Sequence, residues 1–230
     1  MKPRFKYVPR GFDKTLCLIP GWGADFRIFR NLDLDYNYLY ALDFSPRNFN
    51  QSLVDALWET RIEKISLFGW SMGAFLAKEF ALDNLDKIDE IFFISMRPHY
   101  DALTLRTAEE KLKSNKKAFL YKAYLEGFGS RDDLARAWFK KNLLRDFCSE
   151  FKLDELLAGL DYLGSAFIRP PDLVKLGDFK VFHGSQDSTA PLVEVRELLS
   201  QQPKARLTVM EGVGHMPFLH PDFKEAFRNG

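Results

Sequence analysis

Short apolar runs alternate along the chain with segments whose apolar residues recur at helical spacing. Runs rich in apolar, β-branched and aromatic residues are typical of strands and lie at 15–20, 36–44, 64–70, 88–95, 178–184 and 205–211. Several are apolar at successive positions, which suits strands buried on both faces of a parallel sheet. Between the runs, the pattern predicts helices near 24–31, 50–60, 72–84, 191–201 and 220–228. This alternation predicts an α/β fold with a mostly parallel, doubly wound sheet.

The alternation stops in the middle of the chain, where helical patterns follow one another without strands. Ser130, followed closely by two aspartates, predicts a helix start there, because acidic side chains are favoured near the positive end of the helix dipole. The Pro170-Pro171 pair predicts the end of this section, since proline cannot continue a helix. We therefore expect a helical cap at 97–171, inserted into a core formed by 1–96 and 172–230.

Composition narrows the class of protein. The chain has 230 residues, 46% of them hydrophobic, which is enough for one sizeable core. The formal net charge of +1 gives no global field that favours nucleic acid or a membrane surface. No apolar run is long enough to span a bilayer, and the basic N-terminus lacks the apolar segment of a secretory signal. We expect a cytoplasmic protein with neither nucleic acid nor membrane as a partner.

Residues 69–73, Gly-Trp-Ser-Met-Gly, match G-x-S-x-G and join a predicted strand to a predicted helix. A strand that turns sharply into a helix brings its backbone close to neighbouring elements, and only a very small residue fits at Gly69 and Gly73. Such a turn lifts the hydroxyl of Ser71 clear of the sheet, beside free N–H groups at the helix start. Ser71 is therefore the candidate nucleophile.

A serine hydroxyl needs a base to take its proton and an acid to orient that base. In this kind of fold the partners follow in the order Ser, Asp or Glu, His, each just past a strand. Asp187 follows the 178–184 strand and His215 follows the 205–211 strand, so we expect them to be the acid and the base. Three other histidines are interpreted as structural or surface residues, with a substrate contact left open for the first: His99, His183 and His220. Asp161 and Asp178 are further acids, but Asp178 precedes its strand and would lie at the wrong end of the sheet.

Acyl transfer also needs donors aimed at the oxyanion that develops in the transition state. One is expected to be the backbone N–H of Met72, directly after the nucleophile. The other is expected from Trp22, in the Pro-Gly-Trp-Gly loop that follows the first apolar strand. Gly21 and Gly23 let this loop bend toward the serine. The chemistry needs no metal or organic cofactor, and no cluster of Cys and His has the spacing of metal ligands.

The ordered motifs P-G-W-G, G-W-S-M-G, G-S-Q-D and G-V-G-H-M-P-F resemble those of the α/β-hydrolase superfamily across nearly the whole chain. Within it, the paired Trp22 and Trp70 resemble the pimeloyl-[acyl-carrier protein] methyl ester esterases of biotin synthesis, the BioH-type enzymes. The motifs of that family typically read H-G-W-G and G-W-S-L-G. Here Pro20 replaces the histidine, and Met72 replaces the leucine while conserving volume and apolarity. Pro20 does not remove the backbone N–H of Trp22, so this expected donor is retained.

The resemblance implies a serine esterase that releases methanol from a pimeloyl methyl ester carried on acyl carrier protein. It also implies an apolar substrate pocket formed by Trp22, Trp70, Met72 and, from the cap, Phe119. Family members meet the acidic carrier with basic cap residues, and residues 97–152 hold thirteen Lys and Arg against eight Asp and Glu. Candidates for carrier docking are Lys116, Lys117, Arg131, Arg136, Lys140, Lys141 and Arg145; the alternative is that these are simply solvated helix faces.

Other functions remain open at this level. One triad serves many acyl groups, so a broad carboxylesterase, a thioesterase, or a lyase resembling the menaquinone-pathway enzyme of this fold is an alternative. A non-catalytic binding protein with an α/β-hydrolase-like fold is more remote, because the sequence supplies a complete set of three catalytic residue types. The acyl chain length, the need for a carrier and the oligomeric state are not fixed by the sequence.

Overall fold

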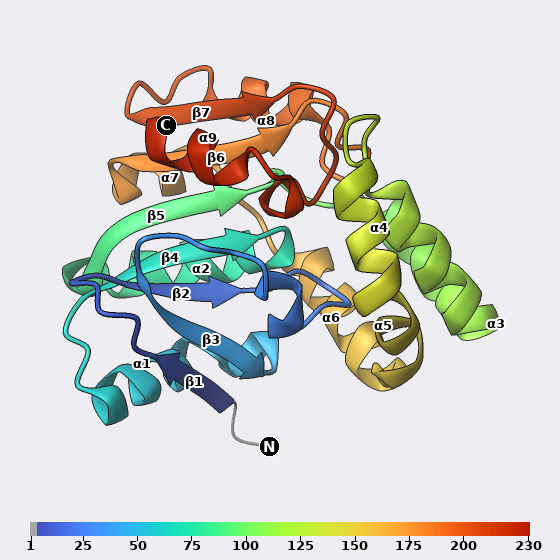
Figure 1. Cartoon of the computed structure of the whole chain (residues 1–230), viewed down its shortest axis with the longest axis horizontal. Coiled ribbons are helices and arrows are strands. Elements are labelled where there is room, and N and C mark those ends of the chain that lie inside the picture. Colours follow the sequence, from blue (N-terminus) through green and yellow to red (C-terminus); the bar gives the residue numbers. More distant parts are fainter. Residues whose placement is uncertain (1–3) are drawn as a thin grey trace.

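The computed structural model describes residues 4–230 as an α/β sandwich around one sheet (Figure 1). Within these residues the sheet has seven strands in the order β1-β3-β2-β4-β5-β6-β7, with β1 antiparallel to β3 and the other neighbours parallel. The predicted fold class is confirmed. The strands are β1 (Arg4–Val8), β2 (Thr15–Ile19), β3 (Asn37–Asp43), β4 (Ile65–Trp70), β5 (Ile88–Ile94), β6 (Phe179–Gly184) and β7 (Ala205–Met210).

Helices cover both faces of the sheet. On one face α2 packs between α1 and α7. Gly69 of β4 faces α2, so the neighbouring Phe68 points to the opposite face, where its ring packs against Phe223 and Phe227 of α9. These helices and the remaining core helix are α1 (Phe49–Thr60), α2 (Met72–Asp83), α7 (Pro170–Leu176), α8 (Leu192–Leu199) and α9 (Phe223–Asn229).

The first four of the five helices between β5 and β6, called the cap helices below, lie beside the carboxyl ends of the parallel strands, toward which the arrowheads of β2, β4 and β5 point in Figure 1. They are α3 (Ala102–Glu126), α4 (Asp133–Asn142), α5 (Leu144–Glu150) and α6 (Leu153–Ser165). Asn115 interrupts α3 with a non-helical backbone (φ −154°, ψ 87°), and its side chain accepts the Ala118 N–H at 3.0 Å. α3 therefore consists of two helical segments joined at Asn115.

The structure departs from the sequence pattern at three places. The helix expected near 24–31 is only a 3₁₀ turn, η1 (Phe26–Phe29), because Phe29 turns inward onto Phe68 and Phe218. Pro170 begins α7 instead of only closing the helical section, since proline is tolerated at the first helical position. The edge strand β1 was not expected. The other 3₁₀ turns are η2 (Pro46–Asn48), η3 (Leu85–Lys87) and η4 (Pro217–Leu219).

Within residues 4–230, no helix combines the length and apolarity that a membrane crossing requires. The cytoplasmic location expected from the sequence stays a prediction.

Candidate active site

Ser71 lies at the sharp turn between β4 and α2. Its backbone has φ 54° and ψ −115°, an unusual conformation for a residue with a side chain. The Ser71 N–H holds the turn in place by donating to the carbonyl of Ile94 at 2.9 Å. A Cβ at Gly69 would lie 2.4 Å from the carbonyl oxygen of Gly73, and one at Gly73 would lie 2.3 Å from that of Ile19. These close approaches explain why both positions are glycine.

Three side chains from distant parts of the chain meet at this turn. His215 Nε2 lies 2.9 Å from Ser71 Oγ, and His215 Nδ1 lies 2.7 Å from Asp187 Oδ2. All three residues are buried, with exposed fractions of 7% for Ser71, 5% for Asp187 and 7% for His215. The second carboxylate oxygen of Asp187 accepts the N–H groups of Thr189 and Ala190 at 2.9 and 2.8 Å. The structure thus brings together the serine, acid and histidine selected from the sequence.

Asp187 stays ionised although it is buried. Burial acts to raise the pKa of Asp187, but His215, through its charge and hydrogen bond, together with His183 and the Ala190 N–H, outweighs it, so this pKa is lowered overall. An ionised Asp187 holds the proton of His215 on Nδ1, which leaves Nε2 free to accept the proton of Ser71. Burial lowers the pKa of His183, which lies behind Asp187 and directs Nε2 at the carbonyl of Ala190 at 2.7 Å. His183 is therefore a neutral neighbour of the acid.

Trp70 supports His215 from the other side. Its indole N–H donates to the carbonyl of His215 at 2.8 Å, and the two ring centroids are 5.6 Å apart. The Trp70 side chain also packs against Phe218, with centroids 5.2 Å apart, and only 4% of the residue is exposed. Trp70 thus contacts the candidate base directly, while its expected contact with substrate stays a prediction.

The loop after β2 lies against the nucleophile. A Cβ on Gly21 would lie 3.1 Å from Ser71 Cβ. The next residue, Trp22, places its indole against α6, where Nε1 donates to the carbonyl of Leu156 at 2.8 Å. The Met72 N–H is the first donor of α2 and has no partner inside the helix. Both expected oxyanion donors therefore belong to segments that contact Ser71, and their role stays a prediction.

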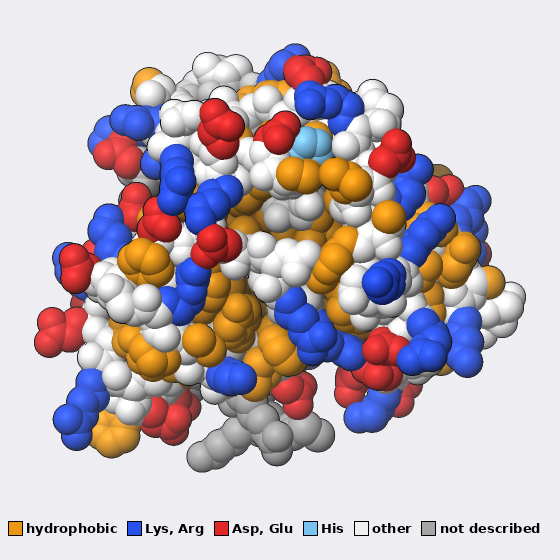
Figure 2. Space-filling model, in the orientation of Figure 1, with side chains coloured by type: hydrophobic (Ala, Val, Ile, Leu, Met, Phe, Trp, Pro, Cys, Tyr) orange, Lys and Arg blue, Asp and Glu red, His pale blue; other side chains and the backbone are white. Residues whose placement is uncertain are grey.

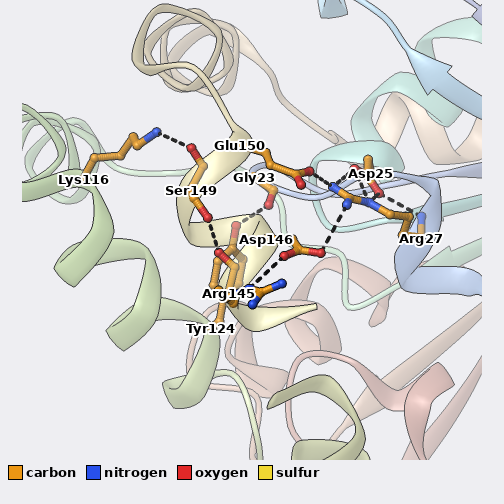
Figure 3. A network of polar contacts seen from close by, with 9 residues as sticks. All are labelled: Gly23, Asp25, Arg27, Lys116, Tyr124, Arg145, Asp146, Ser149 and Glu150. Carbon is orange, nitrogen blue, oxygen red and sulfur yellow. Dashed lines mark hydrogen bonds and ion pairs between the residues drawn. The ribbon is translucent and has the colours of Figure 1, made fainter. Parts of the chain in front are cut away.

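Polar contacts connect the same loop to the cap helices (Figure 3). The hydroxyl of Tyr124, near the end of α3, donates to the carbonyl of Gly23. Farther along the loop, Arg27 forms hydrogen bonds at 2.7 Å with both Asp25 and Glu150 of α5. The position of the segment that carries the Trp22 N–H therefore depends on α3 and α5.

Tyr100 lies at the nucleophile and was not selected from the sequence. Its hydroxyl oxygen is 3.5 Å from Ser71 Oγ, and the guanidinium of Arg97 lies 4.5 Å from its ring centroid. Burial raises the pKa of Tyr100, so the hydroxyl keeps its proton. Tyr100 also lines a groove of about 980 Å³ between α3 and α6. Apolar side chains in the wall of this groove are Leu105, Leu157, Leu160 and Phe167.

Phe119 packs against the indole of Trp22 in an edge-on arrangement, with ring centroids 6.4 Å apart. It lines a smaller groove of about 320 Å³ along α3, together with Lys111 and Lys122. Phe119 thus lies next to one expected pocket residue, Trp22.

The cap cations differ in their surroundings. Figure 2 shows Lys and Arg side chains, with acids among them, at the lower right, over the region of α3 and α5 in Figure 1. Lys117, Lys140 and Lys141 are exposed. Arg136 instead turns inward and donates to the carbonyl of Gly129 at 3.0 Å, while Lys116 donates to the carbonyl of Ser149 at 3.3 Å. The remaining two candidates, Arg131 and Arg145, lie 3.7 and 3.3 Å from the carboxylates of Asp222 and Asp146.

The other candidate residues make contacts elsewhere. His99 stacks on Phe167 with centroids 5.8 Å apart, and His220 accepts the Asp222 N–H at 3.2 Å. Asp161 forms an ion pair with Arg47 at 2.5 Å, and Asp178 directly precedes β6. In the described part of the chain, no group of three or more His, Cys, Asp or Glu side chains is placed to hold a metal ion.

Comparison with known proteins places this geometry in a family. A sequence model described as the alpha/beta hydrolase family matches residues 16–223. The chain belongs to the alpha/beta hydrolase family. Both the family and the enzyme class predicted from the sequence are confirmed: the chain is a hydrolase that acts on carboxylic esters.

Curated relatives of this alpha/beta hydrolase include two named pimeloyl-[acyl-carrier protein] methyl ester esterase. The protein from Photorhabdus laumondii is 24% identical over 235 residues, which cover 91% of this chain and 88% of the relative. The protein from Yersinia pseudotuberculosis is 24% identical over 267 residues, which cover 100% and 97%.

Solved structures show the same fold. A bromoperoxidase from Bacillus anthracis has a TM-score of 0.85 and 19% identity, covering 98% of this chain and 93% of its own. An enol-lactonase from Burkholderia xenovorans has a TM-score of 0.81 and 15% identity, covering 99% and 94%. At these identities the likeness concerns the fold alone.

Proposed function

We propose that this alpha/beta hydrolase cleaves its ester through an acyl-enzyme formed on Ser71. The observation that carries the proposal is the buried relay from Ser71 Oγ through His215 to Asp187, with separations of 2.9 and 2.7 Å. Hydroxyl, imidazole and carboxylate in this order are the groups that activate a serine nucleophile.

The mechanism follows from these positions. Ser71 attacks the ester carbonyl while His215 Nε2 takes its proton, and ionised Asp187 stabilises the resulting imidazolium. The N–H groups of Trp22 and Met72 bind the oxyanion. The alcohol leaves with the proton from His215. Water, activated by His215, then attacks the acyl-enzyme, and the acid product leaves a regenerated Ser71.

We further propose that the substrate is a pimeloyl methyl ester on acyl carrier protein. The tryptophan-containing motifs and the names of the two curated relatives support this substrate. The acyl chain would lie in the groove between α3 and α6, whose volume of about 980 Å³ falls in the range of small-molecule sites. Tyr100 lines this groove and its hydroxyl lies 3.5 Å from Ser71 Oγ, which supports placing the ester at the Tyr100 end of the groove. The expected pocket residues do not line it: Trp22, Trp70, Met72 and Phe119.

The decisive test of the mechanism is Ser71→Ala. Hydrolysis of p-nitrophenyl acetate is expected to fall by roughly 10³-fold or more, as it does when a triad nucleophile is removed. Covalent labelling by a fluorophosphonate is expected to disappear. Ser52→Ala on α1 is the control and should keep both properties. Near-wild-type hydrolysis by folded Ser71→Ala would exclude the proposed mechanism.

The substrate needs a separate experiment. We expect kcat/KM for methyl pimeloyl-carrier protein to exceed the values for free methyl pimelate and for short esters, and the gene to complement a biotin auxotroph that lacks the esterase. Equal turnover of all esters, with no complementation, would leave a broad carboxylesterase. Faster cleavage of a carrier-bound thioester would favour the thioesterase alternative.

A further inference from the structure

We propose that Asp132, a buried carboxylate in the cap, is a positioning residue for His215. The inference rests on the proposed role of His215 as general base and is independent of which ester the enzyme cleaves. Asp132 is 1% exposed, and its Oδ2 accepts the N–H groups of Gly129 and Gly214, each at 2.7 Å. Gly214 immediately precedes His215, so one carboxylate oxygen joins the cap to the loop of the base.

Helix capping does not explain this arrangement. Asp132 occupies the N-cap position of α4, where an aspartate normally accepts an N–H from the first turn of its own helix. Its side chain makes no such bond to α4. A buried carboxylate is costly unless its hydrogen bonds compensate for lost water. Here the compensating donors come from two separate segments, and one of them carries the base.

The backbones of these segments are in direct contact. The His215 N–H donates to the carbonyl of Gly127 at 2.7 Å, and the Arg131 N–H donates to the carbonyl of Gly212 at 2.9 Å. A Cβ on Gly214 would lie 2.3 Å from the Gly127 carbonyl oxygen. We call this contact between 127–132 and 212–215 the cap–base seam. Asp132 Oδ2 accepts one N–H group from each of these two segments. Because this contact comes from a side chain, a substitution can remove it without changing the backbone.

The position of His215 matters because proton transfer requires the 2.9 Å separation from Ser71 Oγ. A misplacement of about 1 Å at such a group can lower a rate by about 10²-fold. Loss of the Gly214–Asp132 bond removes one of the contacts that set this position. The expected result is slower chemistry with unchanged binding of a small substrate.

The experiment compares Asp132→Ala, Asp132→Asn and the neighbouring control Asp133→Ala, whose native side chain is 87% exposed. It measures kcat and KM for p-nitrophenyl acetate, the rate and final extent of fluorophosphonate labelling, and far-UV circular dichroism. For Asp132→Ala we expect kcat and the labelling rate to fall about 10- to 100-fold, with KM and the final extent of labelling unchanged.

Asp132→Asn should rescue the activity. Both hydrogen bonds use Oδ2, while Oδ1 has no hydrogen-bond partner within residues 4–230. An amide oxygen at the Oδ2 position therefore keeps both bonds that position the loop, and we expect kcat within about threefold of wild type. The amide N–H groups at the Oδ1 position gain no partner, so this variant should lower the free energy of unfolding more than kcat. Asp133→Ala should match wild type.

For Asp132→Ala, the inference would be overturned by a wild-type kcat and labelling rate, or by a loss of activity equal to the loss of labelled, folded protein. If the alanine variant does not fold, Asp132→Glu replaces it, because the added methylene displaces the carboxylate in a buried site. Asp132→Glu is expected to be slower than Asp132→Asn, and wild-type kcat in Asp132→Glu would also reject the proposal. Activity of Ser71→Ala, by contrast, would reject the serine mechanism itself.

Discussion

At the scale of single residues, the ionisation of Asp187 links the active site to stability. Its pKa is lowered in the folded protein, because His215, together with His183 and the Ala190 N–H, outweighs the effect of burial. The ionised form therefore stabilises the fold above the unfolded pKa of about 4, and this contribution is lost as the pH falls through the folded pKa. Urea unfolding between about pH 3 and pH 7 should show a stability difference between wild type and Asp187→Asn that shrinks below about pH 4. A difference independent of pH would contradict this assignment.

Tyr100 gives a second prediction at this scale. Its protonated hydroxyl lies 3.5 Å from Ser71 Oγ, so in the proposed mechanism it could donate a hydrogen bond to an ester bound at Ser71. Removing one neutral hydrogen bond costs about 0.5–1.5 kcal/mol, so Tyr100→Phe should lower kcat for p-nitrophenyl acetate about 3- to 10-fold. Tyr121→Phe is the control, because Tyr121 is 51% exposed on α3. An unchanged kcat in Tyr100→Phe would assign this hydroxyl to packing alone.

Site residues could be predicted from the sequence where a local motif marks them, and not where tertiary packing alone places them. Ser71, Asp187 and His215 carry short motifs next to apolar strands, and strand order then places them at one edge of the sheet. Tyr100 and Asp132 have no such motif. Their positions depend on how the cap packs against the core, which is tertiary information that a local pattern does not contain.

At the scale of elements, α6 controls the loop of Trp22. A Cβ on Gly159 would lie 2.5 Å from Trp22 Cδ1, whereas the nearest contact of a Cβ on Gly164 is Leu105 Cδ1 at 3.6 Å. Gly159→Ala should displace an indole that is held by its bond to Leu156 and lower kcat about tenfold or more through the oxyanion loop. Gly164 lines the groove proposed for the acyl chain, so both variants are assayed with p-nitrophenyl acetate, whose acetyl group is too short to extend along that groove. With this substrate Gly164→Ala should keep kcat and raise the free energy of unfolding by up to about 1 kcal/mol. Equal kcat values in Gly159→Ala and Gly164→Ala would show that the position of the Trp22 side chain does not affect catalysis.

Helices and strands could be predicted where a short stretch of sequence itself shows which positions are buried. The six strands predicted from apolar runs all form; β2 and β4 are buried along their whole length, whereas β7, at the edge of the sheet, is buried only at Met210. The helix predicted near 24–31 does not form, because the side chain of Phe29 is buried against Phe68 and Phe218. The break in α3 at Asn115 also escaped detection, because lysines on both sides continue a helical composition.

At the scale of the whole molecule, charge is unevenly distributed. Lys117 and Lys140 are exposed on the cap. Their positive charges would attract an acidic carrier protein and increase its rate of association. Lys117→Glu combined with Lys140→Glu should lower kcat/KM for the carrier-bound ester about tenfold at low salt, with little change for p-nitrophenyl acetate. Added salt should narrow the difference from wild type. Lys64→Glu, directly before β4, is the control for Lys117→Glu alone, because each reverses one exposed charge, and an equal effect there would remove the cap from carrier docking.

The contact between 127–132 and 212–215 limits how this enzyme can be recombined with its relatives. A chimera that takes a foreign segment between β5 and β6 would bring its own backbone to the surface on which His215 depends. If Asp132 positions His215 as proposed, such a transplant is expected to keep a working base only when the donor reproduces the glycine at 129, where a Cβ would lie 2.3 Å from the Gly212 carbonyl oxygen, and the acid at 132. Changes of substrate range are therefore better sought by replacing single side chains along α3 and α6 than by exchanging the inserted helices as a block.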